Sequence, residues 1–180
     1  MSNHQTLPKI KLRAMEPEDL DVLYKIENDT SLWGVGVTNV PYSRYTLHDY
    51  IANSVGDIYT DKQVRLMIDN EQGQTVGIID ITDFDPRHRR AELGVVIQCQ
   101  HRGKGYAKAA ILEVIAYARE ILHLHQLYLY VDTQNVISLE IFKKSGFTCS
   151  AELKDWLLKG ENYKNAVLMP VSYTHLRAHE

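Results

Sequence analysis

Residues Gln100 to Ala107 (QHRGKGYA) combine features that suit the binding of a phosphate group. Gly103 and Gly105 let the backbone turn tightly and approach a ligand without a Cβ atom in the way. A helix that begins just after this turn presents unpaired N–H groups and the positive end of its dipole to the same point. Arg102 and Lys104 add positive charge there. The segment therefore predicts a loop that grips a phosphate.

The spacing of the glycines excludes two common phosphate loops. A dinucleotide fingerprint needs a third small residue three positions after Gly105, where this chain has Lys108. A Walker loop needs a glycine separated by four residues from its Gly-Lys pair and a Ser or Thr after that pair, and the pair Gly103-Lys104 meets neither condition. An ordinary turn between a strand and a helix remains the plain alternative for this segment taken alone.

Length and composition limit the class of protein and its partners. The 180 residues suit one domain. With 44% hydrophobic and 24% charged residues and no apolar run of membrane-spanning length, the chain is typical of a soluble globular protein without a membrane partner. The start, Met1 to Pro8, lacks a basic region followed by an apolar stretch, so we expect a cytoplasmic location. The net charge of -3 argues against a nucleic-acid partner.

The two cysteines predict neither a metal site nor a disulfide framework. Cys99 and Cys149 lie fifty residues apart without a second thiol near either. Zinc sites and disulfide scaffolds need closely spaced or more numerous cysteines. We expect no metal.

The phosphate loop connects a predicted strand to a predicted helix. Alternating or apolar runs predict strands at 10–13, 64–69, 75–81, 91–97, 126–131, 147–158 and 165–169. Apolar residues at helical spacing predict helices at 17–27, about 47–54, 107–121 and 135–144. The unit 91–131 requires a right-handed crossover, which makes its two strands parallel. The chain thus predicts an α/β (α+β) single domain with a mixed, mostly antiparallel sheet of about seven strands flanked by about four helices.

Two irregular segments complete this outline. Residues 29–42 are rich in glycine and proline, and with the helix that follows they are expected to form a wall of the acceptor site. A polar bend is predicted at 83–90. Residues 171–180 fit neither period and resemble a translated sequencing-library adaptor. We therefore expect the domain to span 1–169 and a non-native tail to span 170–180.

Three separated motifs resemble those of the GCN5-related N-acetyltransferases. The first is Gln100-x-x-Gly103-x-Gly105-x-Ala107, the second runs from Asn135 to Phe147, and the third runs from Gly160 to Met169. Together they cover about residues 10–169 in the family's order. The segment 88–92 and the last motif are most similar to the ribosomal-protein and spermidine acetyltransferase branch.

The resemblance implies that acetyl-CoA is the co-substrate and that its acetyl group passes directly to an amine. It implies a pyrophosphate held by the backbone N–H groups of Arg102, Gly103, Lys104, Gly105, Tyr106, Ala107 and Lys108. Val95, Val96 and Ile97 would pair with the pantetheine arm like a neighbouring strand, and an N–H near Val95 would polarise the thioester carbonyl. Asn135 would contact the cofactor arm or its water; a helix N-cap is the alternative role.

Glu92 is the candidate base for the acceptor. A protonated amine must lose a proton before it attacks, and Glu92 is a lone acid in an otherwise apolar run. A salt bridge to Arg89 or Arg90 is the alternative explanation. His88 is a weaker candidate, because a histidine in a polar bend is usually solvated.

The proton donor for the leaving thiolate is an open question. Many relatives carry a tyrosine in the helix after the asparagine, and this chain has Phe142 there. Tyr106, Tyr130 and Tyr163 are alternative donors, although aromatic side chains more often pack.

We therefore predict an N-acetyltransferase for a primary amine, either a polyamine such as spermidine or a protein's N-terminal amine. The acids expected to attract a cationic acceptor are Glu27, Asp29, Asp49, Asp83 and Asp85. The alternative is a non-catalytic module that binds CoA or acetyl-CoA. The sequence leaves open whether copies of the chain form a homo-oligomer.

Overall fold

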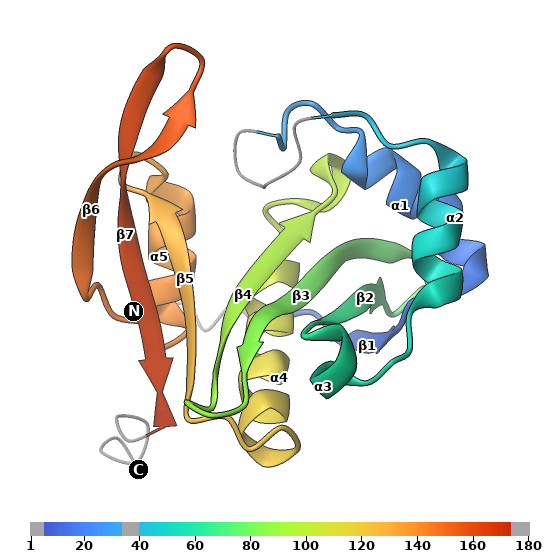
Figure 1. The fold of residues 1–180 in the computed structure, drawn as a ribbon, viewed down its shortest axis with the longest axis horizontal. Coiled ribbons are helices and arrows are strands. Elements are labelled where there is room, and N and C mark those ends of the chain that lie inside the picture. Colours follow the sequence, from blue (N-terminus) through green and yellow to red (C-terminus); the bar gives the residue numbers. More distant parts are fainter. Residues whose placement is uncertain (1–5, 34–39, 174–180) are drawn as a thin grey trace.

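The computed structural model of the protein describes residues 6–33 and 40–173 (Figure 1). Parts of three predicted features lie outside the described residues: the beginning of the chain at 1–5, the middle of the irregular segment at 34–39, and the end of the expected tail at 174–180. No helix in the described ranges is long and apolar enough to cross a bilayer.

One seven-stranded sheet forms the centre of the fold and confirms the predicted sheet. Its strand order is β1-β2-β3-β4-β5-β7-β6. The strands are β1 (Ile10–Ala14), β2 (Val64–Asn70), β3 (Thr75–Asp85), β4 (Arg90–Ile97), β5 (Gln126–Asp132), β6 (Ala151–Lys159) and β7 (Asn162–Ser172). Only β4 and β5 pair in parallel, and every other pairing in this sheet is antiparallel. The parallel pair is the one that the right-handed crossover predicts.

Helices pack on both faces of the sheet. The α-helices in the described residues are α1 (Leu20–Glu27), α2 (Arg44–Asn53), α3 (Ile58–Asp61), α4 (Tyr106–Glu120) and α5 (Val136–Lys144). The four predicted helices are present, although α2 begins three residues before the predicted Leu47, and the short α3 is a fifth. Short 3-10 turns at Pro17–Asp19 and Cys99–His101 precede α1 and the phosphate loop.

Alternation along the strands divides the apolar side chains between the two faces. Ile79 and Ile81 of β3 join the larger core beneath α4 and α5. Ile78 of β3 and Met67 of β2 join the smaller core with Leu23 of α1. Successive strand residues point to opposite faces, so each strand contributes to both cores.

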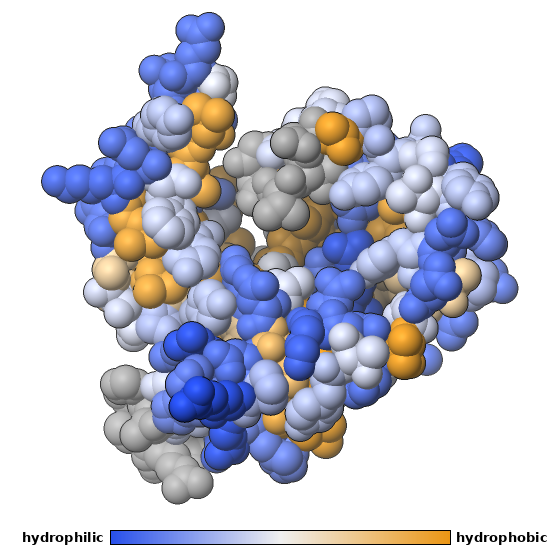
Figure 2. Space-filling view, in the orientation of Figure 1, coloured by the Kyte–Doolittle hydropathy of each residue, from blue (hydrophilic) through white to orange (hydrophobic). Residues whose placement is uncertain are grey.

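β4 and β5 separate along the sheet (Figure 1). They pair only over Arg90–Glu92 of β4 and Gln126–Tyr128 of β5. The base of this pairing is held by Arg89, whose carbonyl accepts from His125 N at 2.7 Å and whose guanidinium Nε donates to the His123 carbonyl at 2.7 Å. Beyond Glu92 the two strands diverge, and Figure 2 shows the surface hollowed between them. We call this opening the notch.

Three predicted boundaries were wrong. β3 continues through Asp85, so the polar bend starts later than residue 83, and β6 begins at Ala151, four residues after Phe147. β7 continues to Ser172, beyond the predicted end of the domain at residue 169.

The start of the expected tail therefore belongs to the sheet. Val171 pairs with Leu127 of β5 and is 2% exposed. Tyr173 is buried, and its hydroxyl donates to the Ile115 carbonyl at 3.0 Å. Apolar burial at alternate positions continues the strand past Pro170, whose missing N–H did not end it.

Candidate active site

The phosphate loop has the backbone that its glycines predict. Gly103 and Gly105 adopt φ angles of 74° and 88°, in the left-handed region that favours glycine. Gly105 is also the N-cap of α4, and no side chain caps this helix, so its first N–H groups keep their donor capacity. A Cβ on Gly103 would meet nothing within 4 Å, which leaves the turn open to a ligand. The loop therefore fits a phosphate group.

Two exposed cations lie on this loop; Arg102 fastens it to the end of β4, and Lys104 bonds within the loop. Arg102 Nε donates to the Ile97 carbonyl at 2.9 Å, and Lys104 Nζ donates to the Gln100 carbonyl at 3.2 Å. Both side chains leave their remaining donors on the solvent side of the loop, where a diphosphate would bind.

The last residues of β4 border the notch. Val95 and Val96 pair with Ile79 and Ile78 of β3, but lie past the last pairing with β5. Gly77 of β3 permits a close approach here, because a Cβ at this position would lie 2.2 Å from the Val96 carbonyl oxygen. A strand edge without a neighbouring strand is suited to an extended ligand.

Glu92 lies at the vertex of the notch. It occupies the last register position at which β4 pairs with β5, opposite Tyr128. Burial raises the pKa of the half-buried Glu92 carboxyl, and the negative charge and hydrogen bond of Asp83 raise it further. Among the described residues its suggested salt-bridge partners bind elsewhere: Arg89 donates to His123, and Arg90 pairs with Asp85 at 3.6 Å. The salt-bridge alternative was therefore wrong.

Asn135 and Phe142 lie at the start and near the end of α5, the helix that follows β5. Asn135 caps α5, because its Oδ1 accepts from Ser138 N at 3.1 Å, which confirms the N-cap role. Phe142 is buried and contacts Phe147 edge to face at a centroid distance of 5.4 Å. Its ring packs in the core and has no proton to donate.

The comparison with protein families decides the class of this chain. Residues 9–148 match the acetyltransferase (GNAT) domain. The chain belongs to this family. It is an N-acetyltransferase that uses acetyl-CoA as its co-substrate.

Individual relatives agree with this assignment. A spermidine N(1)-acetyltransferase of Escherichia coli K12 is 28% identical over 176 residues, covering 95% of this chain and 90% of the relative. A dodecameric structure of spermidine N-acetyltransferase from Vibrio cholerae is 26% identical with a TM-score of 0.80, and covers 95% of this chain and 98% of the other. Another structure of the enzyme from that organism, in complex with CoA and spermine, has a TM-score of 0.82 at 24% identity, with coverages of 92% and 96%.

Three aromatic side chains of the acetyltransferase's β5 and β6 lie next to one another, and the sequence did not identify them as a group. Tyr128 and Tyr130 of β5 meet at a centroid distance of 5.9 Å, and Trp156 of β6 lies 5.8 Å from Tyr130. Alternation along 126–131 was the available signal, because it places Tyr128 and Tyr130 on the sheet face of Glu92. Trp156 could not be added without knowing the strand order. We call these three side chains the aromatic run.

The five acids predicted to attract an acceptor are not gathered in one place. Glu27 pairs with Arg65 at 2.7 Å, and Asp85 pairs with Arg90. Of the five, Asp83 is the one that interacts with Glu92. Only this acid therefore acts directly on the candidate base.

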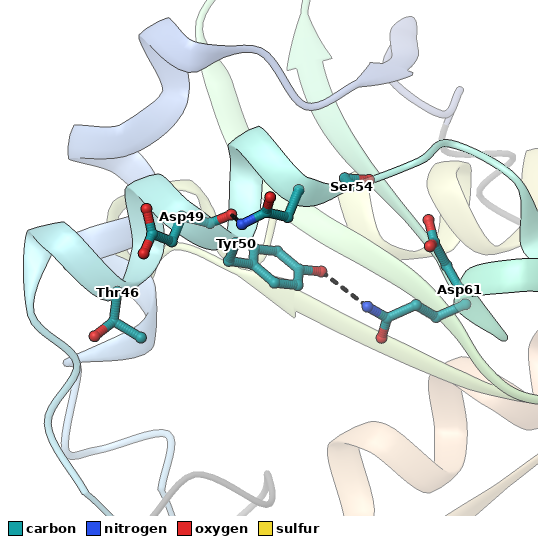
Figure 3. A pocket seen from close by; sticks show the side chains of 7 residues that line it. Thr46, Asp49, Tyr50, Ser54 and Asp61 are labelled. Atoms are coloured by element: carbon teal, nitrogen blue, oxygen red, sulfur yellow. Dashed lines mark hydrogen bonds between the residues drawn. The ribbon is translucent and has the colours of Figure 1, made fainter.

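Asp49 lines a separate cavity of about 310 Å³ beside α2 (Figure 3). Tyr50 lines this cavity, and its hydroxyl accepts a hydrogen bond from Gln63 Nε2 at 3.2 Å. Asp61 borders the same cavity, and its carboxylate accepts from Val55 N at 3.2 Å, which anchors the turn between α2 and α3. This cavity contains none of the predicted cofactor or catalytic residues.

The three tyrosines considered as proton donors lie in different surroundings. Tyr163 is 64% exposed near the β6–β7 turn. Tyr106 begins α4 and contacts His101 edge to face at 6.3 Å. Tyr130 lies in the aromatic run, on the same face of the sheet as Glu92.

Proposed function

We propose that this acetyltransferase acetylates a primary amine of a polyamine such as spermidine. The observation that carries the proposal is the pair of acids at the vertex of the notch, Glu92 and Asp83, next to the aromatic run. A polyamine carries several ammonium groups on a flexible apolar chain. Acids attract the ammonium groups, and aromatic faces bind both cations and methylene groups. The spermidine acetyltransferases similar to this chain support the same acceptor.

The geometry of the aromatic run suits an acceptor with repeated charges. Its successive ring centroids are 5.9 and 5.8 Å apart, which spaces the ring faces at regular intervals away from Glu92. Trp156 is 54% exposed at the far end, so a distal ammonium group would stay partly hydrated there. A protein N-terminal amine has no second ammonium at such a spacing, and we rank it below a polyamine.

Glu92 would serve as the general base. A primary ammonium has a pKa of about 10.4, and an ordinary glutamate has a pKa of about 4.3, so proton transfer between them in water is uphill by about 8 kcal/mol. Burial and Asp83 raise the pKa of Glu92 and reduce that difference. After transfer, the amine nitrogen holds an unshared electron pair for attack.

The co-substrate supplies an acetyl thioester when it is bound, and the residues around the notch fit it. Arg102 to Lys108 would hold the pyrophosphate through backbone N–H groups, Arg102 and Lys104 adding charge. The free edge at Val95–Ile97 would pair with the pantetheine arm, and an N–H near Val95 would stabilise charge on the thioester oxygen. Asn135 uses its Oδ1 for the helix cap, so its amide nitrogen is the atom assigned to the cofactor arm.

Phe142 cannot donate a proton, so the CoA thiolate would leave without a proton donor at this position of α5. A thiol has a pKa of about 8.5, so a thiolate is an adequate leaving group near neutral pH. The alternative of a non-catalytic CoA-binding module is not favoured, because the relatives named above are acetyltransferases. The dodecameric relative supports assembly into a homo-oligomer, and the cytoplasmic location stays a prediction.

An acceptor panel with detection of free thiol tests the function. Spermidine and spermine should release CoA faster than butylamine, which has one charge, and faster than a peptide with a free N-terminus. Glu92→Gln should lower kcat/KM for spermidine by about 100-fold or more, because it removes the base. Glu140→Gln, on the exposed face of α5, is the matched control and should have no effect. If both polyamines release no more thiol than hydrolysis does, the polyamine function is refuted. If Glu92→Gln is fully active, the role of Glu92 as the base is refuted.

A further inference from the structure

β3 changes register at the point where β4 carries Glu92. Thr82 pairs with Glu92, and the next pair is Asp85 with Arg90. Two residues of β3, Asp83 and Phe84, therefore face the single residue of β4 between those pairs. This is the arrangement of a β-bulge, which re-aims the side chains around it.

The bulge reverses the faces to which two side chains point. Ile79 and Ile81 belong to the core beneath α4, so strict alternation would direct Asp83 to that core and Phe84 to the face of Glu92. Instead Phe84 is 6% exposed within that core and contacts Tyr59 edge to face at 5.2 Å. Asp83 adopts a left-handed backbone with φ of 48°, is exposed, and interacts with the Glu92 carboxyl group.

The backbone of Asp83 is unfavourable unless the surroundings impose it. A left-handed φ carries an energetic cost for a non-glycine residue, although aspartate tolerates it better than most. Burial of Phe84 offsets this cost, because the alternative leaves an aromatic ring in solvent. The strand thereby holds a carboxyl group beside the candidate base.

The Asp83 carboxyl acts on Glu92 through its charge and its hydrogen-bonding capacity. Two carboxyl groups can hydrogen-bond to each other only when one of them holds a proton. Glu92 is half-buried and Asp83 is exposed, so a proton delivered to this pair is better held by Glu92, whose charged form burial disfavours. Tyr128 of β5 also interacts electrostatically with Glu92, and the charge of Arg90 on β4 acts on Tyr128 in the opposite direction. Burial raises the pKa of Tyr128, and the charges of Glu92 and Asp83 raise it further, so its hydroxyl stays neutral.

We propose that Asp83 is a positioning residue that accepts a hydrogen bond from Glu92 once Glu92 has taken the acceptor's proton. This inference rests on the proposed function of Glu92 as the base. In the step, an N–H bond of the acceptor ammonium breaks, its electron pair stays on nitrogen, and an O–H bond forms on Glu92. The new O–H donates to the Asp83 carboxylate, whose negative charge stabilises the protonated Glu92. Asp83 thus makes Glu92 a stronger base without touching the acceptor.

Titration of Glu92 tests the proposal without any turnover. In protein labelled with ¹³C at the glutamate carboxyl carbons, the Glu92 signal is assigned by its loss in Glu92→Gln. Asp83→Asn keeps the shape and removes the charge, and its Glu92 signal should titrate at lower pH than in the wild type. Asp85→Asn is the matched control. It removes the charge of a carboxylate that lies two residues further along the same strand and pairs with Arg90, and it should leave the Glu92 midpoint unchanged. An equal midpoint in wild type and Asp83→Asn overturns the proposal.

Kinetics then separate this proposal from the proposed function. In Asp83→Asn the acidic limb of kcat/KM for spermidine should move to lower pH, and the plateau should fall about tenfold as the base weakens. Asp83→Gly, which relieves the left-handed backbone, should shift the limb in the same direction, so instability of one variant does not decide the result. If the Glu92 midpoint depends on Asp83 but the protein transfers no acetyl group to polyamines, only the polyamine function is refuted. Transfer with an acidic limb identical in wild type and both variants would refute the role of Asp83 alone.

Discussion

Gly77 is the position where a single methyl group should disturb the cofactor edge of β4 most. A Cβ at residue 77 would lie 2.2 Å from the Val96 carbonyl oxygen and 3.1 Å from the Ile97 Cα. Real Cβ atoms keep about 3.0 Å or more from such neighbours, so the backbone of β4 must move by at least about 0.8 Å. The end of the Ile97 side chain, with its Cδ1 at 2.9 Å, could move aside, but the closest obstructing atom is the backbone oxygen of Val96. A rotamer change therefore cannot relieve the overlap.

The displacement should affect both stability and cofactor binding. Overpacking of this kind costs about 1–3 kcal/mol, which lowers Tm by about 2–4 °C for each kcal/mol in a chain of this size. Because Val96 lies on the edge assigned to the pantetheine arm, a shift approaching 1 Å should also lower kcat/KM for acetyl-CoA, by up to about 100-fold. Affinity for CoA, measured by titration calorimetry, should weaken in parallel.

A second glycine on the same strand pair provides the comparison. Gly94 of β4 is exposed, and a Cβ there would meet only the Asp80 Cβ, at 3.9 Å. Gly94→Ala should therefore keep the wild-type Tm and CoA affinity, whereas Gly77→Ala should lose both. Wild-type stability and CoA affinity in Gly77→Ala would refute the close packing of β3 against β4. Equal losses in both variants would show that any alanine in these strands is harmful, whatever its contacts.

Two further predictions concern stability. Tyr173→Phe should lower the free energy of unfolding by about 1–2 kcal/mol in urea titrations, because the buried Ile115 carbonyl loses its donor; an unchanged value would show that water replaces the hydroxyl. The second prediction concerns Asp19, whose side chain is 7% exposed and pairs with Arg13 at 2.7 Å. The hydrogen bond from Arg13 lowers the pKa of Asp19 in the folded protein, so its contribution is complete above the unfolded value of about 3.9 and is lost as the pH falls through the lower folded value. Unfolding free energies measured from pH 6 downward should therefore fall less steeply in Asp19→Asn than in the wild type, and parallel curves would contradict this assignment.

The parts of the site that are local in sequence could be predicted from the sequence. The two glycines of the phosphate loop adopt the left-handed angles expected of them, and Asn135 caps α5. These features depend on a few neighbouring residues, whose conformational preferences do not need the rest of the chain. The strand and helix periods likewise gave the succession of strands and helices along the chain, and the crossover rule gave the parallel pair.

Tertiary structure decided the features that depend on how strands pair. Alternation assigns each side chain to a face by counting residues, and the bulge in β3 breaks that count, so only the register with β4 shows that Asp83 meets Glu92. The aromatic run brings together side chains of β5 and β6, and the order of these strands in the sheet, β5-β7-β6, differs from their order in the sequence. Arg89 and Arg90, which are close to Glu92 in sequence, bind other partners. The sequence thus determined the cofactor loop, because that loop is built from contiguous residues. The surroundings of the base were decided by pairing between strands, because side chains far apart in sequence meet there only after the sheet has formed.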